Sequence, residues 1–122
     1  MSLKPDKPFE VMINILRNWV FVYEDEKELQ GQVSELLNKL RVPHKREYTL
    51  GYRSIADFFL EDGTVVEFKL KGSAVNIYKQ IERYTTYDEC TSVILYTSKA
   101  MGMPPEINNK PIYYVSIGTN WL

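Results

Sequence analysis

The sequence has little of several features that would narrow its function at once. Its 122 residues include a single cysteine, Cys90, and a single histidine, His44. One cysteine excludes a disulfide framework or a cysteine-based metal cluster within the chain. No stretch resembles a signal peptide or a membrane-spanning segment. We therefore expect a cytoplasmic protein with no membrane partner.

An excess of charge of one sign is also missing. Fifteen basic and sixteen acidic residues give a net charge of −1, which argues against a protein that depends on bulk positive charge to bind phosphates. The charges are unevenly distributed, however. Basic residues gather between Lys39 and Arg53, and acidic residues gather between Glu24 and Glu28. A basic face is therefore compatible with the neutral total.

The length predicts one domain, residues 9–122, behind a flexible N-terminal arm, residues 1–8. Apolar residues three and four positions apart predict helices over residues 9–23, 25–40 and 74–89. Alternation at the start of the first segment leaves a strand open as an alternative. In the third helix, the residues expected to face inwards are Val75, Tyr78, Ile81 and Thr85. The expected strands are residues 45–51, 55–60, 65–70, 92–97 and 112–117.

The most informative stretch is the predicted hairpin, in which two apolar runs flank Glu61-Asp62-Gly63-Thr64. A two-residue loop would put Glu67 opposite Phe58 and mix polar with apolar groups on both faces. A three-residue loop ending in Gly63 instead puts Asp57 opposite Glu67. It leaves one face wholly apolar, which favours this register. That apolar face would comprise Ala56, Phe58, Leu60, Val66, Phe68 and Leu70.

The predicted register has a chemical consequence. Two carboxylates directly across a strand pair lie about 5 Å apart at Cβ and repel each other unless a cation neutralises them. Lys69 projects from the same face as Glu67, because side chains alternate along a strand. Asp57, Glu67 and Lys69 thus form one group, which the residues alone explain equally well as a solvent-exposed face of salt bridges or as a divalent metal site.

The spacing of these residues is similar to that of a known family. Asp57, nine residues, and then Glu67-Phe68-Lys69 resembles the motif of the PD-(D/E)xK nuclease superfamily, with Ala56 in place of the proline. Gln80 and Tyr84, on the helix after the hairpin, resemble the Gln-x-x-x-Tyr motif of RecB-like nucleases. The resemblance implies an α/β fold: a restriction-endonuclease-like αβββαβ core, with a mixed central sheet flanked by helices and an additional N-terminal helix.

The resemblance also implies a metal site and its surroundings. Asp57 and Glu67, with the Phe68 carbonyl, would bind Mg²⁺ or Mn²⁺, and Lys69 would orient the nucleophile or stabilise the transition state. Gln80 would hold Lys69, a phosphate or a water, and Tyr84 would pack at the rim. Many relatives carry a metal-site glutamate on the first core helix. Here we favour Glu26 over Glu28, because Glu26 lies along the apolar stripe of its helix.

We therefore expect the protein to be a metal-dependent DNA endonuclease, a small resolvase-like phosphodiester hydrolase. The alternatives are a catalytically inactive nucleic-acid-binding module on the same fold and a structural subunit of a larger complex. RNA stays open as a substrate, and the small size favours a homodimer on duplex or branched DNA. The residues expected to contact nucleic acid are Arg46, Arg53, Lys71, Lys79 and Arg83.

Overall fold

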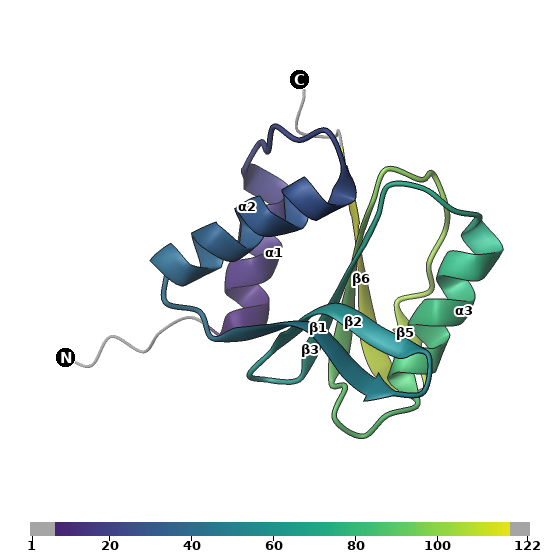
Figure 1. Ribbon diagram of the computed structural model, residues 1–122. Coiled ribbons are helices and arrows are strands. Elements are labelled where there is room, and N and C mark those ends of the chain that lie inside the picture. The colour runs from purple at the N-terminus through teal and green to yellow at the C-terminus, as the bar shows by residue number, and fades with distance from the viewer. Residues whose placement is uncertain (1–6, 118–122) are drawn as a thin grey trace.

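The computed structural model describes residues 7–117, which form three layers (Figure 1). Two helices, α1 (Pro8–Asn18) and α2 (Glu26–Lys39), cover one face of a central sheet, and α3 (Ala74–Thr85) covers the other. None of the helices in the described residues is long and apolar enough to cross a membrane. Of the predicted arm, residues 1–6 lie outside the described residues, and Pro8 already belongs to α1.

The sheet has six strands in the order β1-β2-β3-β4-β6-β5. The neighbouring pairs β1–β2 and β2–β3 are antiparallel, β3, β4 and β6 run parallel, and β5 pairs antiparallel with β6. This mixed sheet, with helices on both faces, confirms the predicted α/β fold class. The short strand β5 was not predicted. The bounds are β1 (His44–Gly51), β2 (Ser54–Leu60), β3 (Thr64–Lys69), β4 (Ser92–Thr97), β5 (Glu106–Ile107) and β6 (Lys110–Ser116).

The predicted register of the β2–β3 hairpin is confirmed. Phe58 pairs with Val66 and Phe59 with Val65, as a three-residue loop requires. Gly63 closes that loop with φ +89° and donates its N–H to the Leu60 carbonyl at 3.0 Å. A left-handed residue is needed at this position, and glycine adopts that conformation without steric strain.

One member of the predicted apolar face is placed wrongly. Ala56 packs in the cluster beneath α3, whereas Phe58 and Leu60 pack in the cluster beneath α1 and α2. The pairing of β1 with β2 skips Glu47 and Asp57, and Glu47 has φ +50°. The regular alternation of faces is interrupted at this point, so strand periodicity alone misassigns Ala56.

The helices differ from the prediction mainly at their ends. α1 is a helix and not a strand, but it ends at Asn18, and α3 ends at Thr85. Val75 is 62% exposed, so its predicted inward position is wrong. Ile77 takes its place: with Ile81 and Tyr84 it forms the buried stripe at positions i, i+4 and i+7.

Gly63 and Gly31 provide a matched test of the loop. A Cβ added at Gly63 would lie 2.7 Å from the Glu89 carbonyl oxygen, at a φ that L-residues rarely adopt, whereas one added at Gly31 in α2 meets nothing within 4 Å. We expect Gly63→Ala to lower the free energy of unfolding by about 1–3 kcal/mol. Gly31→Ala should raise it by about 0.5–1 kcal/mol. Urea unfolding measures both, and equal midpoints would contradict the loop assignment.

Candidate active site

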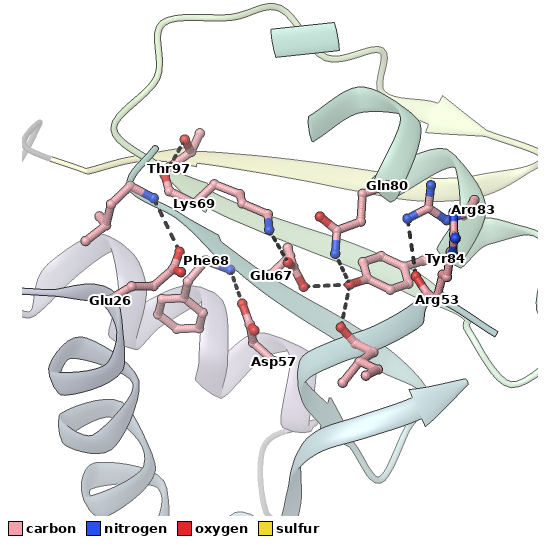
Figure 2. A network of polar contacts seen from close by, with 12 residues as sticks. Glu26, Arg53, Asp57, Glu67, Phe68, Lys69, Gln80, Arg83, Tyr84 and Thr97 are labelled. Carbon is pink, nitrogen blue, oxygen red and sulfur yellow. Dashed lines mark hydrogen bonds and ion pairs between the residues drawn. The ribbon is translucent and has the colours of Figure 1, made fainter. Parts of the chain in front are cut away.

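Strands β2 and β3 pair next to their loop and separate beyond the Phe58–Val66 pair. Two carboxylates fill the gap between the separated strands (Figure 2). The Phe68 backbone N–H donates to Asp57 Oδ2 at 2.8 Å, and the Leu70 N–H donates to Glu26 Oε1 at 3.3 Å. Both N–H groups lie on the edge of β3 that faces β2. Asp57 and Glu26 therefore replace the missing strand partner at this edge, although they come from β2 and α2.

The Phe68 carbonyl lies on the same edge. In a strand, the N–H and C=O of one residue point in the same direction, and successive residues alternate between the two edges. The neighbouring Lys69 carbonyl accordingly points to β4, where it accepts from Thr97 Oγ1 at 2.6 Å. The Phe68 carbonyl thus projects between the two carboxylates, and three oxygen donors lie along one strand edge.

Glu67 is buried and points towards α3 rather than into the gap. Its Oε1 accepts a hydrogen bond from the Tyr84 hydroxyl at 2.8 Å, and its Oε2 pairs with Lys69 Nζ at 3.0 Å. Gln80 Nε2 donates to the same hydroxyl at 2.8 Å, and the hydroxyl also lies 2.8 Å from the Ile55 carbonyl. Because a hydroxyl has one proton, Glu67 and Ile55 compete for it. Tyr84 is fully buried, so its predicted position at the rim is wrong; it ties β2, β3 and α3 together.

The ionisation of this group is strongly coupled. Burial, followed by the charge of Glu67, raises the pKa of Asp57 to about 7, although the Phe68 N–H opposes the shift. Burial also raises the pKa of Glu67, against the effects of Lys69 and Tyr84. For Lys69, burial would lower the pKa, but the attraction of Glu67, Asp57 and Glu26 raises it overall. Three carboxylates thus share one ammonium, and a further cation would relieve their repulsion.

A polar cleft of about 500 Å³ opens beside Asp57 and Glu26. Three of the residues that line it were not among the predicted site residues. Gln30 had a detectable signal, because it lies four positions after Glu26 on the same helix face. Glu47 had none, since its placement depends on the irregular backbone of β1. The lining residues are Glu26, Lys27, Gln30, Arg46, Glu47 and Asp57.

Of the predicted metal ligands, Asp57 and Glu26 reach this strand edge, whereas Glu67 turns towards α3. Within residues 7–117, no group of three or more His, Cys, Asp or Glu side chains is arranged to hold a metal ion. Lys69 and Tyr84 occupy both oxygens of Glu67. The oxygen donors at the edge of β3 are Asp57, Glu26 and the Phe68 carbonyl. Such hard oxygen ligands suit Mg²⁺ or Mn²⁺, and they do not suit metals that prefer thiolate or imidazole ligands.

Glu26 and Glu28 are clearly distinguished by their positions. Glu26 is half-buried and reaches the Leu70 N–H, whereas the Glu28 side chain is exposed. The backbone N–H of Glu28 is capped by Asp25 Oδ1 at 2.8 Å, which starts α2 at the correct place. The helix start therefore directs Glu26, and not Glu28, towards the cleft.

The predicted nucleic-acid contacts do not form one patch. Arg46 lines the cleft, with its guanidinium 5.6 Å from the Phe58 ring centroid. Arg83 Nη2 donates to the Arg53 carbonyl at 3.3 Å, which pairs these two residues at the β1–β2 turn. Lys71 is exposed just after β3. Lys79 lies on α3 beside a separate hollow.

No protein-family model, curated protein or solved structure matches the chain.

The raised pKa of Asp57 predicts a pH-dependent stability in EDTA. Because its pKa rises from 3.8 to about 7 on folding, the folded state holds the proton more tightly. The resulting stabilisation is complete below about pH 4 and is lost as the pH rises to 7. Asparagine at position 57 does not titrate. The free energy of unfolding of Asp57→Asn, relative to that of wild type, should therefore increase by roughly 1–3 kcal/mol between pH 4 and pH 8.

Urea unfolding across this pH range measures the gain. Asp88→Asn is the matched control, because the Asp88 side chain is exposed. A constant difference between Asp57→Asn and wild type at every pH would show that Asp57 titrates normally and would contradict the prediction.

Proposed function

We propose that this protein is a metal-dependent DNA endonuclease with a restriction-endonuclease-like core and a PD-(D/E)xK site. The observation that carries the proposal is the meeting of Asp57, Glu26 and the Phe68 carbonyl at the free edge of β3, with Glu67 and Lys69 beside them. The order of elements adds support, since α2, β1–β3, α3 and β4 follow the order of that core. A homodimer and a cytoplasmic location stay predictions from size and composition.

Each residue of the site has a role in this proposal. Asp57 and the Phe68 carbonyl would hold Mg²⁺ or Mn²⁺, with Glu26 binding directly or through water. Glu67 would join them by exchanging its contact with Lys69 or Tyr84 for the cation. When bound, the cation supplies stabilisation of phosphate charge and lowers the pKa of a coordinated water. Lys69 stands beside the carboxylates, where its ammonium orients the attacking water and stabilises negative charge on the scissile phosphate.

Gln80 and Tyr84 act on the site through Glu67. Tyr84 donates to Glu67 from the side opposite Lys69, and Gln80 fixes the Tyr84 hydroxyl. This arrangement holds the Glu67 carboxylate and, through it, the Lys69 ammonium in fixed positions. Both helix residues are thus positioning residues rather than groups that touch the substrate.

A second candidate is a nucleic-acid-binding module that does not cut. One observation favours it: within residues 7–117, no three acidic, histidine or cysteine side chains are gathered as ligands. On this view the Lys69–Glu67 ion pair is permanent, and the Lys69 ammonium takes the place of a metal as the cation beside the carboxylates. The two candidates make opposite predictions for cleavage.

We expect wild-type protein to cut plasmid, single-stranded or branched DNA in Mg²⁺ or Mn²⁺, and not in EDTA. Asp57→Asn and Lys69→Met should each reduce the rate at least about 100-fold, because each removes charge stabilisation in the transition state. Glu35→Gln and Lys39→Met are the matched controls, since both side chains are exposed on α2. A gel-based cleavage assay measures the rates.

Two outcomes would contradict this proposal. Metal-dependent cutting that persists in both Asp57→Asn and Lys69→Met would refute the site. DNA binding with no cutting in any metal would instead support the second candidate.

Metal binding can be tested without DNA. A ligand that binds only the folded state at 100 times its Kd stabilises that state by about 2.7 kcal/mol. Saturating Mn²⁺ should therefore raise the melting temperature of wild type, and Asp57→Asn should lose most of this increase. Glu35→Gln should keep it. Equal shifts in all three proteins would place metal binding elsewhere.

A further inference from the structure

The turn between β1 and β2 presents an aromatic side chain to solvent. Tyr52 and Arg53 form this turn, and Tyr52 is 83% exposed. The Arg53 guanidinium lies 5.2 Å from the centroid of the Tyr52 ring. A cation over one face of a tyrosine ring leaves the other face free for stacking.

The turn is held in place from below. A Cβ at Gly51 would lie 2.5 Å from the Tyr87 ring, so the backbone packs directly on that ring. Arg53 has φ +58°, and its carbonyl accepts from Arg83 on α3. Tyr52 is therefore exposed on an anchored turn. An anchored aromatic loses little conformational entropy when it binds a ligand.

The turn is also connected to the candidate active site. Arg53 and Arg83 lie beside Tyr84 at one end of the polar network, and Asp57 lies along β2 from the turn (Figure 2). Tyr52 lies five positions before Asp57, which corresponds to at most about 17 Å of extended chain. A nucleic-acid strand advances 3.4 Å per nucleotide in a duplex. The ring is thus within about five nucleotides of the proposed cleavage position.

We propose that Tyr52 stacks on an unpaired base of the DNA strand that enters the candidate active site, which makes the substrate DNA with single-stranded bases next to the cut. This inference rests on the proposed function, since it assumes that the site receives DNA. Arg53 and Arg83 place positive charge where the adjacent phosphates pass. Stacking supplies affinity that needs no net positive charge, which suits a chain of net charge −1.

The stacked base must be unpaired. Inside a duplex, both faces of every base are covered by neighbouring bases, and opening a step costs a few kcal/mol. A tyrosine on a turn stacks without that penalty on a base in a single-stranded segment. The structure therefore favours branched, frayed or single-stranded DNA over intact duplex.

The test measures binding in EDTA, so that it does not depend on cleavage. Oligonucleotides that carry 2-aminopurine in a single-stranded segment are titrated with wild type, Tyr52→Ala, Tyr52→Phe and Val22→Ala. Stacking should quench the 2-aminopurine in wild type and Tyr52→Phe. Tyr52→Ala should lose the quench and bind about 5- to 150-fold more weakly, the range for loss of one stacked base. Val22→Ala is the control, with 82% of that side chain exposed.

An abasic nucleotide identifies the stacked position. An abasic site is moved along the strand, one position at a time. At one position it should weaken binding by wild type but should not further weaken binding by Tyr52→Ala. Non-additive losses show that the ring and that base contact each other. Additive losses at every position would overturn the inference. Equal affinity of Tyr52→Ala and wild type for single-stranded DNA would overturn it as well.

The outcomes separate this inference from the proposed function. Cleavage that depends on Asp57, with no effect of Tyr52→Ala on binding, would refute the stacking and keep the nuclease. Binding and quenching that depend on Tyr52, with no cleavage in any metal, would support the stacking and refute the nuclease. An absence of binding to any DNA would refute both.

Discussion

The site depends on one backbone feature: β3 extends beyond its pairing with β2, and two of its N–H groups need acceptors. An unsatisfied buried N–H costs about 1–3 kcal/mol. Asp57 and Glu26 supply the acceptors for Phe68 and Leu70. Backbone hydrogen bonds thus hold the carboxylates at the strand edge, although the two negative charges repel each other.

The second constraint is the shared charge of the network. Glu67 lies between an ammonium and a phenol, and burial raises its pKa. Burial of Asp57, followed by the charge of Glu67, raises the pKa of Asp57. Groups with such pKa values change protonation when a cation or an anion arrives. The same coupling explains why one structure fits two candidates: a permanent ion pair at Glu67 suits a binding module, and an exchangeable one suits a metal-dependent enzyme.

Much of the fold was predictable, for reasons that differ between elements. Gly63 and the apolar runs on either side of it determined the hairpin register, because a slip of one residue would have exposed Phe58 and Val66. β4 was predictable from its continuous apolar run. Val75 was assigned wrongly because valines occur on exposed helix faces too, and Ile77 completes the stripe equally well.

The sequence by itself determined that Asp57, Glu67 and Lys69 lie near one another, because a short loop joins the two strands that carry them. Only the tertiary structure decided which glutamate reaches them. Glu26 lies 44 residues from Leu70, and the packing of α2 against the sheet brings the two together. The tertiary structure also decided that Asp57 turns into the gap while Glu67 turns to α3, since that choice depends on the hydrogen-bond partners that distant elements supply.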